Sequence, residues 1–156
     1  MVAPIVRDFL DERRAEFTET SHYRAPSALS EAHKDHTPPT EMVKTVVVRV
    51  GSGYILAALA ANTKIDWPSL AHVLGTAEVW LASEGEIEAL FPEVETGAVP
   101  PLGPLFHLPV YVDSHLAAQD RVAFTAGSHT NTIHMSFAQF LQLAEPRICS
   151  FSVPEH

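Results

Sequence analysis

Apolar and polar positions follow two different periods along the chain, and each period predicts a different kind of element. In residues 4–14 the apolar side chains recur three and four positions apart between charged ones, which is typical of a helix with one buried face. Residues 44–50, KTVVVRV, are rich in β-branched side chains and predict a strand. A GSG turn separates this strand from residues 54–61, YILAALAA, which we expect to pair with it as a hairpin.

Four polar residues mark the starts of further helices, because their side chains can accept a hydrogen bond from a backbone N–H group of the first turn. One of them, Ser83, is followed three residues later by Glu86, which together predict a capping box. The predicted helices are residues 28–36 after Ser27, 67–75 after Asp66, 84–91 after Ser83 and 137–143 after Ser136.

Other short runs of β-branched and aromatic residues predict strands. They occupy residues 17–21, 77–82, 108–113, 121–127, 131–135 and 147–153. Helices and strands alternate irregularly in this order and include hairpins, which favours an α+β fold over a doubly wound parallel sheet. The sequence shows no internal repeat and no linker, so we expect residues 1–156 to form one domain.

Composition narrows the possible partners. The chain has 10 Lys and Arg against 19 Asp and Glu, a formal charge of 10 − 19 = −9, which is unlike a general nucleic-acid binder and argues against a DNA partner. Any nucleic acid must therefore meet a small basic site or be delivered by another protein. Residues 1–14 carry charges where a signal peptide needs an apolar stretch, and Cys149 is the single cysteine. We expect a cytoplasmic protein that does not enter membranes.

Lys44 is the first candidate for chemistry, because it stands at the mouth of an apolar strand directly after a proline-containing turn. A lysine at a strand end is usually held in solvent. The alternative is a cation at the edge of a cleft, where it could hold a phosphate or a carbonyl oxygen.

Residues 97–104, GAVPPLGP, are the second candidate. Their glycines permit a close backbone approach to a ligand, and their prolines fix the backbone and remove donors. The remaining N–H groups, those of Ala98, Val99, Leu102 and Leu105, could form an oxyanion pocket without charged side chains. The segment could equally be a structural connection between a helix and a strand.

The third candidate is AGSHTNT, residues 126–132, where His129 stands among polar side chains in a turn. A single histidine is more often a hydrogen-bonded structural residue than a catalytic one. His33 and His36 lie three apart, but neither an HExxH motif nor a cysteine pair accompanies them, so we expect no metal and no other cofactor. The sequence also lacks a G-x-S-x-G motif, and Cys149 has no evident base nearby.

Several stretches, in their order along the chain, resemble the YbaK/EbsC family of aminoacyl-tRNA deacylases, which also occurs as a domain associated with prolyl-tRNA synthetases. The matching stretches are His22 before a short helix, MVKTVVVRV, YILAALAANTKIDWPSLAHVLG, VWLASEGEIEALFP, GAVPPLGP, LPVYVD and FTAGSHTNTIHMSFAQF. Three positions depart from the usual pattern, namely Thr20, Arg24 and Ser27. These departures bear on amino-acid specificity more than on the type of reaction.

The resemblance implies a single mixed, largely antiparallel sheet flanked by helices, and a pocket for the 3′ end of aminoacyl-tRNA. It implies catalytic roles for Lys44, Gly103 and His129. It implies substrate contacts from His22, Gly97, Ala98, Val99, Pro101, Leu102, Gly127 and Ser128. The implied reaction is hydrolysis of the ester of a mischarged tRNA, and a synthetase is a further candidate partner.

Two other functions stay open at this point. The same pocket could bind an aminoacyl or nucleotide ligand without hydrolysis, as a regulatory module, or the protein could merely dock on a synthetase. Lys44 at a cleft edge favours the deacylase over simple docking. Because GAVPPLGP offers short aliphatic side chains and no charge, we expect small aminoacyl groups such as alanyl, seryl, cysteinyl or prolyl to be preferred.

Overall fold

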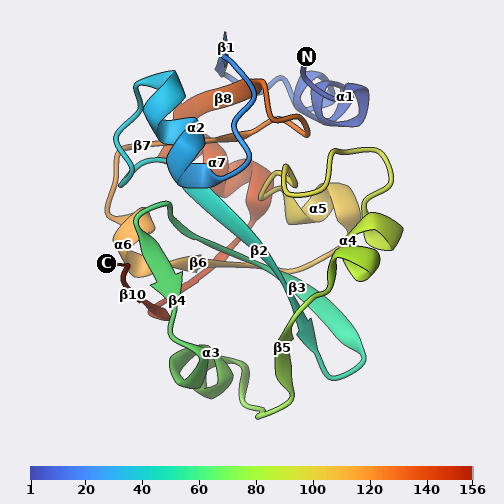
Figure 1. Cartoon of the computed structure of the whole chain (residues 1–156), viewed down its shortest axis with the longest axis vertical. Helices are drawn as coiled ribbons and strands as arrows, with labels where there is room; N and C mark the ends of the chain where they lie inside the picture. Colours follow the sequence, from blue (N-terminus) through green and yellow to red (C-terminus); the bar gives the residue numbers. More distant parts are fainter. Residues whose placement is uncertain (156) are drawn as a thin grey trace.

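The β2–β3 hairpin forms the centre of the molecule in the computed structural model, which describes residues 1–155 (Figure 1). β2 (Val43–Val50) and β3 (Gly53–Ala60) pair antiparallel, with Val43 opposite Ala60. β5 (Val79–Leu81), β6 (Val110–Asp113) and β9 (Arg147–Cys149) complete a five-stranded sheet in the order β5-β2-β3-β6-β9. Because β3 lies in the middle of this sheet and is covered on both faces, it is almost continuously apolar.

The remaining strands form two smaller sheets, so the expected single sheet is divided into three. β1 (Thr18–Ser21), β8 (Asn131–Ser136) and β7 (Arg121–Thr125) pair antiparallel in the order β1-β8-β7. β4 (Thr63–Ile65) pairs with β10 (Ser152–Pro154). A parallel bridge between Met42 and Ala123 joins the start of β2 to β7. The α+β class and the largely antiparallel pairing are confirmed. Apart from that bridge, the parallel strand pairs among the described residues are β3–β6 and β6–β9.

The predicted helices form close to their expected positions. They are α1 (Pro4–Glu12), α2 (Ala28–Asp35), α3 (Trp67–Leu74), α4 (Glu84–Leu90) and α7 (Phe137–Ala144). Ser27 and Ser136 accept the expected N-cap hydrogen bonds, and the capping box of Ser83 and Glu86 is complete. Asp66 is the N-cap of α3, but its carboxylate accepts from the Ser69 hydroxyl instead of a backbone N–H.

Two short helices, the strand β4 and one strand break were not predicted. α5 (Gly103–Phe106) lies inside the expected loop, and α6 (Ser114–Ala117) follows β6 directly. The run 147–153 splits into β9 and β10, which belong to different sheets. The helices within residues 1–155 all lack the combination of length and apolar character needed to cross a bilayer.

The core lies on both faces of the five-stranded sheet. On one face, α1 and α7 pack with β7 and β8 against alternate residues of the central strands, and Phe124 and Phe140 are fully buried there. On the other face, Leu70 of α3 and Phe151 pack against Leu59 of β3. Figure 1 shows α1 and α2 at the end of the molecule where β8 lies, and α3 at the opposite end.

The break between β9 and β10 is held by Asp113, which is fully buried at the end of β6. Its Oδ1 accepts from the backbone N–H groups of Phe151 (2.8 Å) and Ser152 (3.0 Å), and its Oδ2 accepts from the Ser152 hydroxyl (2.7 Å). Burial alone would raise the pKa of Asp113, but hydrogen bonds from Ser152, Phe151 and His115 outweigh it and lower the pKa below its ordinary value. The corner that leads the chain into β10 therefore depends on an ionised carboxylate.

Asp113→Asn should lower the free energy of unfolding at pH 7 by about 1–3 kcal/mol, because the amide replaces one acceptor oxygen of a buried hydrogen-bonded group. Since the folded-state pKa of Asp113 is lowered, the stabilisation is present above the ordinary pKa of about 3.9 and is lost as the pH falls through the lowered value. Urea unfolding at pH 7 and at about pH 3 measures both effects. The two proteins should become more alike in acid, and an undiminished difference there would contradict the role given to the carboxylate.

Candidate active site

A cavity of about 200 Å³ lies where four segments meet that are far apart in the sequence. Its wall is formed by the start of α2 and the residues before it, by the start of β2, by the loop at Gly97 and by the turn after β7. The lining residues are Ala25, Ser27, Ala28, Glu31, Val43, Lys44, Thr45, Gly97, Val99, Thr125 and His129. The volume lies below the ~300–1,000 Å³ of pockets for drug-sized ligands, so the cavity suits a small group.

Lys44 lines this cavity, but its ammonium group is engaged elsewhere. Its Nζ donates to the Thr63 carbonyl at 2.5 Å and to Oε2 of Glu155 at 3.0 Å. Side chains alternate along a strand, so Val43 and Thr45 share one face of β2 and Lys44 lies on the other. That other face borders a neighbouring cavity of about 520 Å³, which Lys44 also lines. The hydrogen bond from Lys44 and its charge lower the pKa of Glu155.

His129 also lines the cavity, with its ring held from both sides. Nδ1 lies 2.9 Å from the Ala25 carbonyl and Nε2 lies 2.8 Å from the Thr96 carbonyl. The ring is 5% exposed, and its backbone N–H donates to Glu95 at 2.7 Å. Both nitrogens thus face backbone carbonyl oxygens, and a neutral ring, which carries a single N–H, donates to one of the two. The geometry suits a residue that ties the segment before α2 to the loop at Thr96.

Gly97 needs to be a glycine because it lies against that ring. Its φ is +84°, and a Cβ placed on it would come within 3.3 Å of His129 Cε1. Of the loop residues expected to bind substrate, Gly97 and Val99 line the cavity. Ala98 is fully buried and its N–H donates to the Glu95 carbonyl at 3.0 Å, so this N–H is not available to an oxyanion.

The rest of the predicted loop lies away from the cavity wall. Pro101, Leu102 and Gly103 are buried and are not among the lining residues. A Cβ on Gly103 would fall 2.1 Å from the Leu108 carbonyl oxygen and 2.4 Å from Val110 Cγ2. Packing therefore explains why residue 103 is a glycine. The expectation that the whole segment 97–104 lines one pocket with Lys44 and His129 needs correction, because the chain turns inward into α5 after Val99.

In the turn at 126–132, too, only some of the predicted residues line the cavity, since His129 does and Gly127 and Ser128 do not. Gly127 has a φ of +83°, and a Cβ there would lie 2.6 Å from Ala3 Cβ and 3.0 Å from Val94 Cγ1. Ser128 is buried, and its hydroxyl donates to Oδ1 of Asn131 at 3.5 Å. Neither residue lines the cavity of His129. Both hold the turn in shape.

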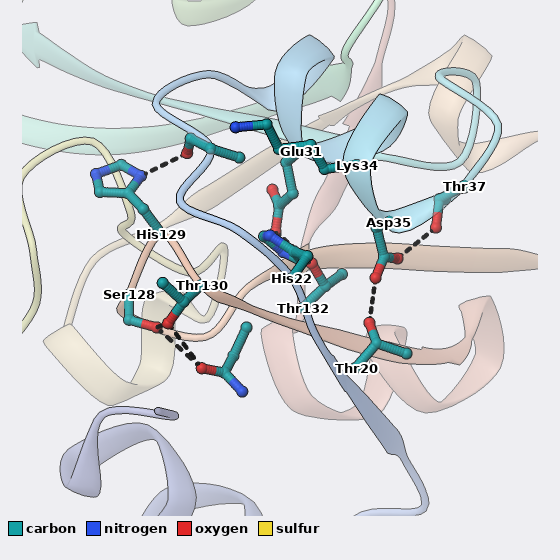
Figure 2. Close-up of polar contacts among 12 residues, drawn as sticks. Thr20, His22, Glu31, Lys34, Asp35, Thr37, Ser128, His129, Thr130 and Thr132 are labelled. Atoms are coloured by element: carbon teal, nitrogen blue, oxygen red, sulfur yellow. Dashed lines mark hydrogen bonds and ion pairs between the residues drawn. The ribbon is translucent and has the colours of Figure 1, made fainter.

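His22 is not among the residues that line this cavity, and it lines a separate one of about 710 Å³. Its Nδ1 is 2.7 Å from the Tyr23 carbonyl and its Nε2 is 2.9 Å from Oγ1 of Thr132. The Thr132 hydroxyl in turn donates to Oε2 of Glu31 at 2.6 Å. Figure 2 shows the Glu31 side chain pointing from α2 toward His22 and Thr132. His22 therefore meets the cavity wall at Glu31, both directly at 3.9 Å and through Thr132.

Glu31 is the lining residue that sequence reasoning missed. It is 1% exposed, and its Oε1 has no hydrogen-bond partner among residues 1–155. Burial, reinforced by the nearby charge of Asp35 and opposed by the hydrogen bond from Thr132, raises the pKa of Glu31 to about 7. In the sequence, a glutamate in the first turn of a helix is an ordinary solvated residue, and no local signal distinguishes this one.

The other chemistries considered from the sequence find little support in the geometry. Burial raises the pKa of the Cys149 thiol, and Asp113 adds to that effect, so the reactive thiolate is disfavoured. Within residues 1–155, no group of three or more His, Cys, Asp or Glu side chains is placed to hold a metal ion. His33 and His36 instead line the open cavity beside His22.

Comparisons with known proteins place the chain in a family. Residues 22–143 match the model of the aminoacyl-tRNA editing domain. The chain is 30% identical over 149 residues to the multifunctional Ser/Thr-tRNA deacylase ProXp-y of Escherichia coli K12, covering 91% of this chain and 87% of that protein.

Two solved structures share the fold at about one-fifth identity. One, proposed to be a trans-editing enzyme for prolyl tRNA synthetase, aligns with a TM-score of 0.81 and 20% identity over 98% of this chain and 99% of the other. A scaffold protein used for computational grafting of epitopes aligns with a TM-score of 0.85 and 20% identity over 97% of each chain. The matched segment contains the whole cavity wall described above, and the chain belongs to the family of aminoacyl-tRNA editing domains, the YbaK type that its motifs resemble.

Proposed function

We propose that the protein hydrolyses the ester bond of mischarged aminoacyl-tRNA whose aminoacyl group is small. The observation that carries this proposal is the cavity of about 200 Å³ that gathers Lys44, Gly97, Val99 and His129 in a chain of the editing-domain family. The ProXp-y relative, a Ser/Thr-tRNA deacylase, supports the same reaction.

The reaction needs little beyond positioning and stabilisation of charge. Water attacks the ester carbonyl carbon, and the carbonyl oxygen becomes an oxyanion in the tetrahedral intermediate. The bond between this carbon and the ribose oxygen then breaks, the ribose oxygen takes a proton, and the free amino acid and the tRNA with its terminal hydroxyl restored are released. A donor aimed at such an oxyanion typically contributes about 2.7–4 kcal/mol to lowering the barrier.

Lys44 is proposed to hold a terminal phosphate or the ester carbonyl through its charge. In the structure its ammonium group is bound to Thr63 and Glu155, so it must leave Glu155 to meet the substrate. This ion pair is partly exposed, with 27% and 42% of the two side chains accessible. Exposed pairs of this kind contribute little to stability, so an anionic ligand can compete for the lysine.

The Val99 N–H is the proposed donor to the oxyanion. Val99 lines the cavity, and no backbone or side-chain acceptor is bound to its N–H within residues 1–155. The Ala98 and Leu105 N–H groups, which were also candidates, are used in turns with Glu95 and Leu102. His129 acts as a positioning residue, because its ring lies between the Ala25 and Thr96 carbonyl groups and so fixes the loop just before Gly97.

Two cations in and just before α2 are already engaged by other groups of the chain. Arg24 lies 3.6 Å from Glu95, and Lys34 donates to the Arg24 carbonyl at 2.5 Å. Together with the net charge of −9, these contacts favour a partner that supplies basic surface. We propose a synthetase in this role and, with it, action in the cytoplasm, where charged tRNA is used.

Hydrolysis of alanyl-, seryl- and cysteinyl-tRNA should be at least about tenfold faster in kcat/KM than hydrolysis of lysyl- and glutamyl-tRNA. The reason is that Ala25, Ala28, Val43 and Val99 form a small apolar wall, which excludes large side chains by size and charged ones by the cost of desolvation. Release of free amino acid from a panel of the five charged tRNAs measures the preference.

Uncatalysed hydrolysis of each ester serves as the control in that panel. A preference for lysyl or glutamyl groups would show that the side chain does not enter this cavity. Saturable binding of alanyl-tRNA with no hydrolysis above the uncatalysed rate would show that the protein is a binding module and not a deacylase.

A further inference from the structure

The cavity contains one carboxylate among its lining residues, Glu31, and nothing in the described chain satisfies it fully. Ser27, Ala28 and Glu31 lie on one face of α2, since residues three and four apart on a helix are neighbours, and all three belong to the cavity wall. Oε2 of Glu31 accepts from Thr132, whereas Oε1 is shielded from solvent without a partner. The carboxylate is therefore anchored by one oxygen, while the other is buried beside the cavity without a partner.

An open buried carboxylate costs stability. The pKa of Glu31 is raised to about 7, above the ordinary value of about 4.3, mainly because burial disfavours the charged form. Since the folded-state pKa is the higher one, the fold loses stability as the pH rises from about 4 to about 7. Buried charges are normally paired, so a cationic donor beside Oε1 would restore what burial removes.

The side chains around the cavity do not supply such a cation. The Lys44 ammonium group lies on the other face of β2, bound to Thr63 and Glu155. The ring nitrogens of His129 face the Ala25 and Thr96 carbonyl oxygens, and neither contacts Oε1 of Glu31. His22 contacts Oε2 at 3.9 Å, on the side that Thr132 already occupies. A ligand in the cavity can supply the donor that Oε1 lacks.

We propose that Glu31 binds the α-ammonium group of the aminoacyl ester. This inference rests on the proposed function. An aminoacyl group whose carbonyl oxygen lies at Val99 has its α-ammonium two bonds from the carbonyl carbon, within a cavity only large enough for a small group. Among the groups that every aminoacyl ester presents, the α-ammonium is the one that brings both a positive charge and hydrogen-bond donors. The small apolar residues of the cavity wall would then contact the side chain of the aminoacyl group.

The test compares alanyl-tRNA with lactyl-tRNA, in which a hydroxyl replaces the α-ammonium and the size is unchanged. Each rate is divided by the uncatalysed hydrolysis of the same ester. The unaltered protein should prefer the alanyl ester by about 10- to 100-fold in kcat/KM, the range typical of a hydrogen bond to a charged group. Glu31→Gln should lower the rate for the alanyl ester, leave that for the lactyl ester within about threefold, and so remove most of the preference.

Asp35→Asn is the matched control. Asp35 is a second buried carboxylate on α2, but its oxygens are already bonded, one of them to Thr37 at 2.6 Å and to His134 at 2.8 Å. This variant should keep the preference for the alanyl ester, whatever its absolute rate. Equal losses for both esters in Glu31→Gln would overturn the inference and leave the proposed hydrolysis standing.

Binding of an uncleavable analogue decides the inference even if hydrolysis is not observed. Adenosine carrying an alanyl group in amide linkage at the 3′ position should bind at least about tenfold more tightly than its propionyl counterpart, which lacks the amine. Glu31→Gln should abolish this difference in a calorimetric titration. Equal affinities for the two analogues in the unaltered protein would overturn the assignment of Glu31, whereas an absence of hydrolysis alone would overturn only the proposed function.

Discussion

Lys44→Ala should lower kcat/KM for alanyl-tRNA by about 100- to 1,000-fold, the range seen when one preorganised charge-stabilising group is removed from an active site. The fold should persist, because the Lys44 side chain lies at the start of β2 and, within residues 1–155, its ammonium group bonds to the Thr63 carbonyl and the partly exposed Glu155 alone. We expect the Tm to change by no more than about 3 °C. Steady-state hydrolysis and a thermal melt on the same preparation measure both effects.

Lys64→Ala is the matched control for this experiment. Lys64 lies in β4 next to Thr63 and lines the same neighbouring cavity as Lys44, so its replacement removes an equal charge from nearly the same place. It should retain most of the activity, because Lys64 does not line the cavity of Glu31 and His129. A folded Lys44→Ala protein with full activity, or a loss of the same size in Lys64→Ala, would refute the role proposed for Lys44.

Gly103→Ala should destabilise the protein by about 3 kcal/mol, which corresponds to a fall in Tm of roughly 6–12 °C for a chain of this size. The added methyl group would lie 2.1 Å from the Leu108 carbonyl oxygen, a backbone atom that cannot turn aside as a side chain could. The activity that remains should follow the folded fraction, since Gly103 is buried behind the cavity wall and does not line it.

Gly85→Ala provides the comparison. Gly85 is exposed within α4, and a Cβ there would find nothing nearer than Ser83 Oγ at 4.0 Å. Alanine in a helix interior is more stable than glycine by about 0.5–1 kcal/mol, so this variant should melt at the same temperature or slightly higher. If Gly103→Ala instead keeps its Tm and loses catalysis below 37 °C, Gly103 acts at the reaction centre as the family resemblance implied.

Local chemistry in the sequence determined most of the individual elements. The caps at Ser27, Ser83 and Ser136 lie where the pattern predicts them, because each depends on neighbours within a few residues. The motifs likewise identified the family, which the match over residues 22–143 confirms. The hairpin of β2 and β3 was predictable for the same reason, since only a short turn separates its strands.

Only the tertiary structure decided which strands share a sheet and which residues face the cavity. The sequence of residues 147–153 does not predict the corner between β9 and β10. Asp113, whose carboxylate stabilises this corner, lies more than thirty residues away in the chain. The sequence GAVPPLGP does not distinguish the roles of Gly97 and Gly103. In the structure Gly97 borders His129, whereas Gly103 packs against Leu108. Burial is a property of the assembled fold, and it alone turns Glu31 from a surface helix residue into an unpaired carboxylate in the wall of the cavity.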